Sequence, residues 1–256
     1  MNVPPVIRQY TPDFVRRVRK DWWFVRTRRH FRGLFRSLPI GDAFAEIYRT
    51  KAWGSVDGEE FYSGPGSGPE FATAYAQWVN QFIAEQAVRH IVDLGCGDFR
   101  VGRLLNTSSD VRYTGIDVVA DVVRYNREHF QNAYIEFQCA NIIEDELPDG
   151  DLCLIRQVLQ HLSNQQISRV VDACSRYRYV LITEGVYAGP RVRPNLDKPA
   201  GWDTRIHEQS GVFLDLPPFN LPVQTVLEIP GSRTGVLRTV LLEPNKSFRA
   251  ATGGRG

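Results

Sequence analysis

Residues 92–102 read VDLGCGDFRVG, an apolar stretch that runs into a turn with glycines at positions 95 and 97. A strand that leads through a glycine-rich turn into a helix is typical of nucleotide sites. The dinucleotide pattern G-x-G-x-x-G needs a third glycine at position 100, where this chain has Arg100. The Gly-Lys-Ser/Thr ending of a phosphate loop is absent as well. The turn therefore predicts a nucleotide-like ligand that lacks a pyrophosphate.

Strand-like and helix-like stretches alternate along most of the chain. We expect strands over 90–95, 111–117, 134–140, 151–156 and 178–184, and helices over 71–88, 98–106, 121–130 and 164–177. Two last strands, 223–229 and 235–243, are joined through Pro230 and Gly231 as a hairpin. Alternation of this kind implies right-handed crossovers, so the prediction is an α/β fold with a mostly parallel sheet between helices.

Asp117 follows Gly97 by 20 residues, at the end of the second predicted strand. A carboxylate in this position can accept hydrogen bonds from both ribose hydroxyls of an adenosine group. The alternative is a helix-capping aspartate beside a tight turn. The glycine turn and the acid together, one βαβ unit apart, predict a nucleoside ligand.

The basic character of the chain is concentrated at its N-terminus. Residues 1–52 hold 12 Lys and Arg against 4 Asp and Glu, whereas the other 204 residues hold 19 against 25. Apolar residues recur at three- and four-residue steps over 14–38, which predicts a helix that we expect to break near Gly33. A basic helix can lie on an anionic membrane or on nucleic acid. We favour a helix packed on the domain, or on a second copy in a homo-oligomer, with its arginines in solvent.

Composition narrows the class of protein further. No apolar run approaches the ~20 residues needed to span a bilayer, and no signal-peptide pattern opens the chain. The four cysteines are widely spaced without a CxxC pair, which is typical of reduced thiols rather than a disulfide framework. We therefore expect a cytoplasmic protein without a membrane span.

Four successive motifs, VDLGCGDFRVG, YTGIDVVADVV, FQCANI and DLCLIRQVLQHLS, resemble those of class I S-adenosylmethionine-dependent methyltransferases. The resemblance covers roughly residues 71–243. It implies a Rossmann-like, seven-stranded, mostly parallel sheet with an antiparallel last strand, preceded here by an N-terminal helical extension. On this interpretation residues 1–70 form that extension and a cofactor-covering loop. Residues 71–244 form the methyltransferase domain with an acceptor-binding insertion at 185–222, and 245–256 form a disordered tail.

The resemblance also implies a set of residues for S-adenosylmethionine. The methionine moiety would lie against Asp93, Gly95, Cys96 and Gly97, with Arg156 and Gln157 closing its side; the ribose would lie on Asp117; and the adenine would lie beside Ile116, Val118, Asn141 and Ile142. Many members have Asp where this chain has Asn141, but an amide still offers an acceptor. The glycine-rich stretch around Ser63 and Ser67 resembles a loop that folds over the cofactor in bacterial small-molecule methyltransferases, the alternative being a flexible linker.

The acceptor is less constrained by the sequence. The fourth strand is followed neither by Asn/Asp-Pro-Pro-aromatic nor by Pro-Cys, which disfavours methylation of an exocyclic base amine or a cytosine carbon. His161 suits a general base for a hydroxyl, or else a structural role, and His207 is a second catalytic candidate. Trp202, Asp203 and Arg205 suit a sugar in the proline-rich 185–222 segment, or else a surface loop. Oxygen and nitrogen ligands for an Mg²⁺ ion could come from among six residues: Asp151, Glu184, Asp203, His207, Glu208 and Asp215.

The first half of the chain also resembles actinobacterial sugar O-methyltransferases of the methylmannose-polysaccharide pathway. We therefore predict transfer of a methyl group from S-adenosylmethionine to a hydroxyl of a small acceptor, a sugar or oligosaccharide. The alternative is a nucleic-acid methyltransferase that uses the basic N-terminal region as an electrostatic arm.

Overall fold

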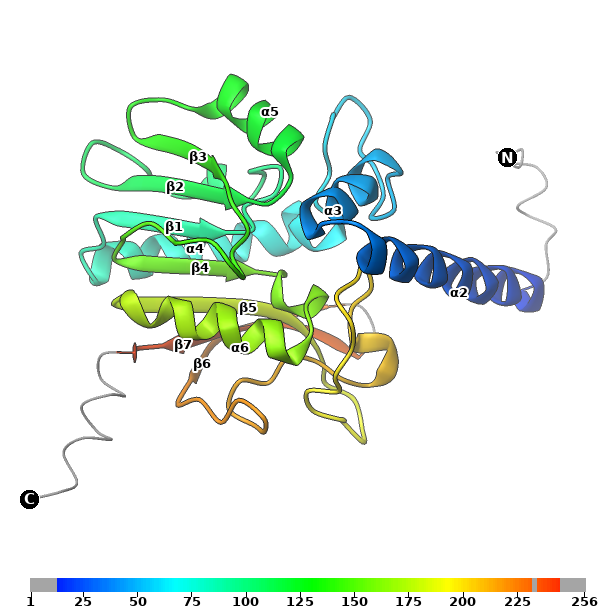
Figure 1. The fold of residues 1–256 in the computed structure, drawn as a ribbon. Helices are drawn as coiled ribbons and strands as arrows, with labels where there is room; N and C mark the ends of the chain where they lie inside the picture. The colour runs from blue at the N-terminus through cyan, green and yellow to red at the C-terminus, as the bar shows by residue number, and fades with distance from the viewer. Residues whose placement is uncertain (1–12, 232–233, 245–256) are drawn as a thin grey trace, which may run out of the picture.

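The computed structural model describes residues 13–231 and 234–244, and of residues 13–21 only the backbone is described. Seven strands form one sheet in the order β3-β2-β1-β4-β5-β7-β6 (Figure 1). They are β1 His90–Leu94, β2 Arg112–Asp117, β3 Ile135–Cys139, β4 Leu152–Arg156, β5 Tyr179–Tyr187, β6 Gln224–Pro230 and β7 Gly235–Leu242. Strands β1 to β5 pair in parallel, and β7 runs antiparallel to β5 and β6. The predicted Rossmann-like sheet is confirmed.

The helices are α2 Asp13–Ser37, α3 Ile40–Arg49, α4 Pro69–Glu85, α5 Ala120–Phe130 and α6 Asn164–Ala173. Short 3-10 helices are η1 Pro65–Ser67, η2 Gly102–Leu104, η3 Leu159–His161, η4 Cys174–Arg176 and η5 Ile206–Glu208. None of the helices in the described ranges is long and apolar enough to cross a membrane.

Successive side chains of the strands point to opposite faces of the sheet and pack into two separate hydrophobic cores, one on each face. Val92 and Leu94 of β1 pack with Ile167 and Val170 of α6, whereas Ile91 packs on the opposite face with α4. Helices α4 and α6 therefore cover opposite faces of the sheet (Figure 1). This arrangement leaves the carboxyl ends of the parallel strands free to form a site.

The predicted helix over 98–106 is wrong. The segment consists of turns with only η2, and Phe99 has a left-handed φ of 57°, which interrupts any α-helix that starts at the glycine turn. The Asp98 carboxylate is also occupied by the backbone N–H of Ser63.

The predicted break near Gly33 is wrong as well, because α2 continues through Gly33 and ends at Ser37. A helix-interior glycine costs only about 1 kcal/mol relative to alanine. The chain instead leaves the helix at Leu38, just before Pro39, as expected for a residue that precedes proline. Helix α3, which no sequence pattern predicted, begins at Ile40.

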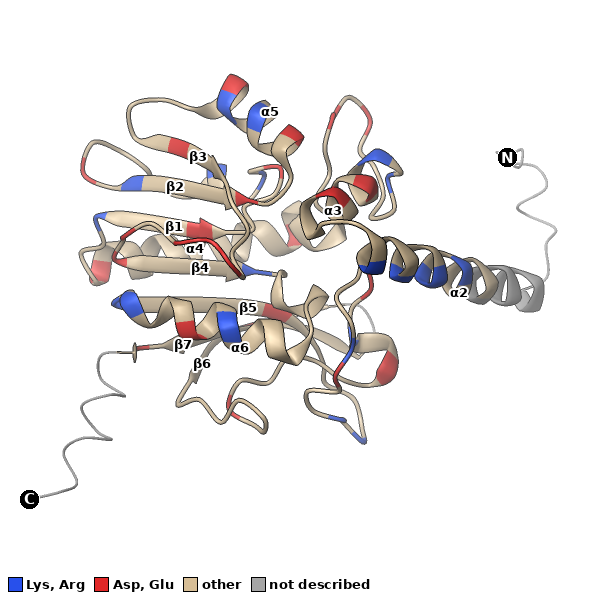
Figure 2. Cartoon of the chain, viewed as in Figure 1, with Lys and Arg blue, Asp and Glu red and all other residues tan. Residues whose placement is uncertain are grey.

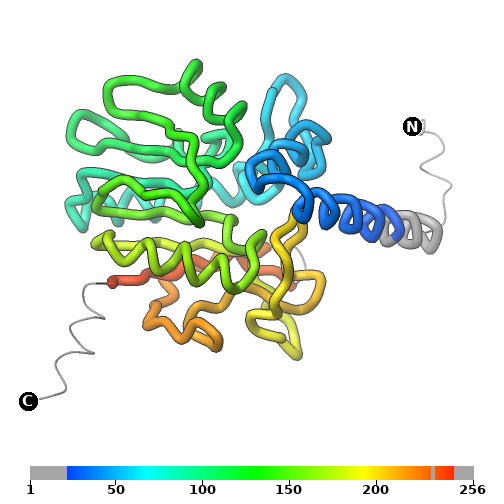
Figure 3. Tube along the Cα trace, viewed as in Figure 1, coloured from blue at the N-terminus to red at the C-terminus, as the bar shows by residue number. Residues whose placement is uncertain are grey.

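Helix α2 projects from the α/β body, which the tube in Figure 3 also shows. Arginines line the described part of this helix, whereas acids and bases are mixed over the rest of the molecule (Figure 2). Among the described side chains, Trp22, Trp23 and Val25 are more than half exposed, but Phe31 is buried. The inner side of α2 therefore packs on the domain, as we favoured, and its outer side faces solvent. The predicted tail over 245–256 lies outside the described residues.

Candidate active site

A cavity of about 1700 Å³ lies at the carboxyl ends of β1, β2 and β4. It has two ends. The glycine-turn end is formed by Gly95–Gly97, Asp117, Asn141 and Arg156, and the aromatic end is formed by Phe44, Trp53, His161 and Trp202. Pockets for a single small ligand have volumes of about 300–1,000 Å³, so this cavity has room for two ligands side by side.

The glycine turn can exist only without side chains at two positions. Gly95 and Gly97 have φ angles of 81° and 55°, in the left-handed region. A Cβ on Gly95 would lie 2.4 Å from Val158 Cγ2, and one on Gly97 would lie 2.3 Å from Ser63 Oγ. The backbone N–H groups of Gly95 and Cys96 both donate to the Ile116 carbonyl, which ties the turn to β2.

Asp117 is held in place by this turn. Its carboxylate accepts from the N–H of Gly97 at 3.0 Å and from the N–H of Val119 at 3.0 Å. Burial raises the pKa of Asp117 above its usual value, and these backbone hydrogen bonds oppose the rise. Each oxygen keeps a lone pair for a hydroxyl in the cavity.

Asp93 also lies in the glycine-turn end, but its carboxylate is hydrogen-bonded to another side chain of the protein. Its carboxylate accepts from the Tyr113 hydroxyl at 2.6 Å, and burial raises its pKa to about 6. Cys96 lies beside it as a half-buried, free thiol whose pKa is raised by desolvation. Asp93 therefore supports the wall of the glycine-turn end through Tyr113, and its raised pKa reduces the negative charge that it presents to a ligand.

The end of β4 offers unused donors. Arg156 Nη2 donates to the Gly66 carbonyl at 2.6 Å, whereas Arg156 Nε and Gln157 Nε2 are buried without a partner among the described residues. Burying an unsatisfied donor costs about 1–3 kcal/mol, so these groups favour a ligand that accepts hydrogen bonds. The carboxylate of the methionine moiety of S-adenosylmethionine fits them, and the unpaired lone pairs on Asp117 fit its ribose.

The segment that carries Ser63 and Ser67 is docked rather than free. Ser63 Oγ accepts from the N–H of Asp98 at 2.9 Å, and it lies 3.0 Å from the Tyr48 hydroxyl. Asp98 returns the contact by accepting from the N–H of Ser63 at 3.1 Å. The Ser63–Ser67 segment thus closes the glycine-turn end, which disfavours the flexible-linker alternative.

His161 lies in the aromatic end, at the end of η3. Its Nδ1–H donates to the Gly201 carbonyl at 3.1 Å, and its ring centroid lies 5.1 Å from that of Trp53. With the proton on Nδ1, Nε2 is the accepting nitrogen, and the Gln160 side-chain amide Nε2 lies 3.4 Å from it as a long, weak donor. Burial, and next the nearby charge of Lys198, lower the pKa of His161 to about 3, so the ring is neutral at physiological pH.

Glu184 supports η3 from β5. Its carboxylate accepts from the backbone N–H groups of Val158, Leu159 and Gln160 at 2.8–3.1 Å. Burial raises the pKa of Glu184 to about 7 even though these three bonds favour its ionised form. Glu184 is thus a support for the turn that carries His161.

The sixteen predicted site residues that line the cavity are Ser63, Ser67, Asp93, Gly95, Cys96, Gly97, Asp117, Val118, Asn141, Ile142, Arg156, Gln157, His161, Trp202, Asp203 and His207. Two lie elsewhere. Ile116 is in the hydrophobic core, and Arg205 is buried with its guanidinium donating to the backbone carbonyls of Leu196, Gln160 and Leu162. The structure therefore gives Arg205 a structural position in place of the predicted contact with substrate.

Asp203 and His207 differ in their surroundings. Asp203 is 4% exposed and pairs with Arg28 and Lys198, whereas His207 is exposed and lies 4.8 Å from the Phe24 ring. Within the described residues, no three His, Cys, Asp or Glu side chains are grouped so that they could hold a metal ion. The six residues of the Mg²⁺ hypothesis do not form such a group.

Several cavity residues were not predicted. Tyr48 and Phe44 come from the unpredicted α3, Asp98 from the wrongly predicted helix, and Trp23 and Phe24 from α2. The only sequence signal for Asp98 was its place directly after the glycine turn.

Comparison with known proteins agrees with this geometry. Residues 91–178, from β1 to the segment before β5, match a family model described as a methyltransferase domain. Malonyl-[acyl-carrier protein] O-methyltransferase of Acetivibrio thermocellus is 38% identical over 58 residues, which are 22% of this chain and 20% of that protein. The match therefore spans about a fifth of that relative's length.

The N-methyltransferase NodS of Bradyrhizobium japonicum, solved with S-adenosyl-L-homocysteine, superposes with a TM-score of 0.53. The aligned region covers 77% of this chain and 98% of NodS at 13% identity, so the likeness shows the fold alone. Residues 91–178 thus match a methyltransferase domain, the fold is the Rossmann-like fold seen in NodS, and S-adenosylmethionine fits the residues at the glycine-turn end of the cavity.

Proposed function

We propose that the protein transfers a methyl group from S-adenosylmethionine to a hydroxyl of a small ring-bearing acceptor, with a sugar or oligosaccharide as the first class to test. The observation that carries the proposal is the continuity of the cavity. The glycine-turn end, with Asp117 and the unused donors of Arg156 and Gln157, opens directly into the aromatic end with His161.

On this proposal the glycine-turn end of the cavity would bind the cofactor and the aromatic end would bind the acceptor. S-adenosylmethionine, when bound, supplies an electrophilic methyl group on a sulfonium. Asp117 would hold the ribose, Arg156 and Gln157 the methionine carboxylate, and the segment around Ser63 would close over them. The acceptor ring would lie between Trp53 and Trp202, where indole faces suit the apolar face of a sugar ring.

His161 would orient the acceptor and take its proton. Its Nε2 is the unprotonated nitrogen because Nδ1–H is donated to Gly201, and the acceptor hydroxyl would replace the long 3.4 Å contact from Gln160 Nε2. A low pKa makes this ring a weak base towards a free hydroxyl. A hydroxyl oxygen becomes strongly acidic as its bond to the methyl group forms, so a weak, well-placed base suffices late in the transfer. Most of the rate would come from alignment of the two ligands.

The test is a methyl-transfer assay with labelled S-adenosylmethionine over a panel of methyl glycosides and oligosaccharides, with and without a chelator. We expect an alkali-stable methyl ether on a sugar hydroxyl. His161→Ala should lose most turnover yet keep its affinity for S-adenosylhomocysteine. An N-methylated product, or a His161→Ala protein with normal turnover at saturation, would overturn the respective assignment.

A second candidate is methylation of a nucleic acid, favoured by the exposed arginines on the outer side of α2. Arg26, Arg29 and Arg36 are exposed, and none of them has an acidic partner in the described part of the chain. Labelled total RNA in the same assay separates the two. Methylation that weakens steeply with salt would favour this candidate, whereas salt-insensitive methylation of free sugars would exclude it.

A further inference from the structure

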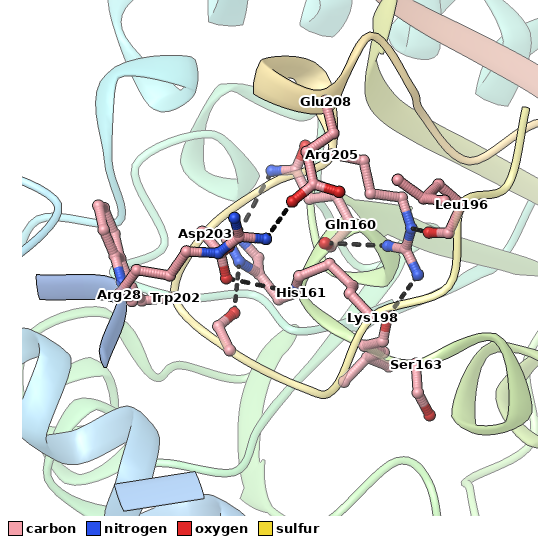
Figure 4. A network of polar contacts seen from close by, with 12 residues as sticks. Arg28, Gln160, His161, Ser163, Leu196, Lys198, Trp202, Asp203, Arg205 and Glu208 are labelled. Carbon is pink, nitrogen blue, oxygen red and sulfur yellow. Dashed lines mark hydrogen bonds and ion pairs between the residues drawn. The ribbon is translucent and has the colours of Figure 1, made fainter. Parts of the chain in front are cut away.

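Arg28 is the one side chain of α2 that forms ion pairs across to the 201–208 segment in the described part of the chain. Its Nε lies 2.7 Å from Asp203 Oδ2, and its Nη2 pairs with Glu208 (Figure 4). One guanidinium thus joins two carboxylates on either side of a turn, 175 and 180 residues further along the sequence. The geometry couples the N-terminal helix to the wall of the aromatic end.

Asp203 is the buried member of this pair. It is 4% exposed, and its second oxygen lies 3.5 Å from Lys198 Nζ, which is 7% exposed and has no hydrogen-bond partner among the described residues. A buried carboxylate between two cations is held in one place far more firmly than a solvent-exposed pair would be. Removal of Arg28 would leave that carboxylate underpaired and free the turn at Glu208.

The 201–208 segment, which Arg28 holds, contacts His161 in the aromatic end of the cavity. Gly201, two residues before Asp203, donates its N–H to the His161 carbonyl at 2.9 Å and accepts from His161 Nδ1 at 3.1 Å. These two bonds set both the position and the tautomer of the ring.

Trp202, the neighbour of Gly201, packs against α2, the helix that carries Arg28. Its ring contacts Trp23, Phe24 and Phe31 of α2 at centroid distances of 5.7–6.0 Å, and its carbonyl accepts from Trp53 Nε1 at 3.1 Å. The aromatic wall and the His161 ring therefore both depend on how the 201–208 segment is seated against α2.

We propose that Arg28 is a positioning residue for acceptor methylation: from α2 it seats the 201–208 segment, which in turn holds the His161 ring and the Trp202 wall. Arg28 touches neither ligand and acts through Asp203 and Glu208. The inference rests on the proposed methyl transfer, and it assigns the basic N-terminal helix a part in the active site.

The experiment compares Arg28→Ala, Arg28→Lys and Arg29→Ala in the full chain. Arg29 is the matched control, because it is the next residue, also an arginine, exposed and without an ion pair in the described ranges. With an acceptor found in the glycoside panel, Arg28→Ala should lose on the order of 10²-fold in kcat/KM for that acceptor, the size expected when a reacting group is displaced by about 1 Å. Affinity for S-adenosylhomocysteine should stay at the wild-type level.

Arg28→Lys should recover part of the loss, since an ammonium keeps the charge but cannot span both carboxylates. It also serves as the test variant if Arg28→Ala does not fold. Equal kcat/KM in Arg28→Ala and Arg29→Ala would overturn the proposal, and so would a parallel loss of S-adenosylhomocysteine binding.

Hydrogen–deuterium exchange separates this inference from the proposed function. In the presence of S-adenosylhomocysteine, the amides of 201–208, including the Gly201 N–H, should exchange faster in Arg28→Ala than in Arg29→Ala. Unchanged exchange overturns the positioning role, whatever the acceptor is. If no acceptor in the panel is methylated by the wild-type protein, the proposed function has failed, and faster exchange alone still supports the seating of the segment by Arg28.

Discussion

Asp117 is a single carboxylate on which two backbone amides converge inside the cavity. Asp117→Asn keeps its shape but replaces one acceptor oxygen with an NH₂ group that would face a backbone N–H. Hydrogen bonds to a charged group contribute about 1.5–3 kcal/mol. We therefore expect affinity for S-adenosylhomocysteine, measured by titration calorimetry, to fall about tenfold or more.

The control for this change is Asp121→Asn, four residues further on. Asp121 is an exposed acid of α5 that pairs with Arg124 at the surface, so its loss should leave cofactor affinity unchanged. Equal affinities of Asp117→Asn and the wild type would remove the ribose assignment.

His161 offers a prediction on stability against pH. The pKa of His161 in the folded state, about 3, lies below the ordinary histidine value of 6.5, so the unfolded chain binds more protons between these two pH values. The stability associated with the neutral ring is complete above about pH 6.5 and is lost as pH falls towards 3. His161→Gln removes this dependence.

Relative to that variant, the wild type should lose about 2 kcal/mol of unfolding free energy between pH 7.5 and pH 5. Urea unfolding of both proteins at the two pH values measures the difference. A difference that does not change with pH would mean that the ring titrates near its usual value.

At the scale of elements, the sequence predicted the sheet well because periodicity reports burial. All seven strands were located within a few residues, since β1, β4 and β5 are buried along their length and read as apolar runs. The glycine turn and Asp117 were located for the same reason, because each follows such a strand.

The errors fall where contacts distant in sequence decide the conformation. Residues 98–106 do not form an α-helix, because Phe99 is left-handed and Asp98 is bound to Ser63, 35 residues away. Arg205 had the chemistry of a ligand contact, but it is buried beneath backbone carbonyls that no periodicity reveals. Trp23 and Phe24 entered the site only through the packing of α2.

Gly33 tests the continuity of α2. A Cβ at this exposed position would meet nothing within 4 Å, and the backbone is helical. Gly33→Ala should therefore raise the free energy of unfolding by about 0.5–1 kcal/mol, measured by urea denaturation. Gly97→Ala is the contrast, because its Cβ would lie 2.3 Å from Ser63 Oγ at a φ of 55°. A destabilised Gly33→Ala protein would contradict the unbroken helix.

At the scale of the whole molecule, the cavity gathers pieces from nearly the whole described chain. Its walls come from α2, α3, the Ser63–Ser67 segment, three strand ends, η3 and the 202–207 turn. None of these pieces forms a pocket alone, so a ligand that occupies the cavity bridges the two faces of the sheet and the N-terminal helices. Binding should then stabilise the molecule as one unit against unfolding.

The size of that effect follows from mass action. At about a hundredfold excess of S-adenosylhomocysteine over its Kd, the native state gains about 2.7 kcal/mol. For a domain of this size that raises Tm by about 5–10 °C, measurable by differential scanning fluorimetry. NAD at the same concentration should give no shift, because Arg100 stands where a dinucleotide turn needs its third glycine and Gly97 is already packed against Ser63. An equal shift with NAD would place the cavity in the dinucleotide-binding class, in which an acid at the position of Asp117 also binds an adenosine ribose.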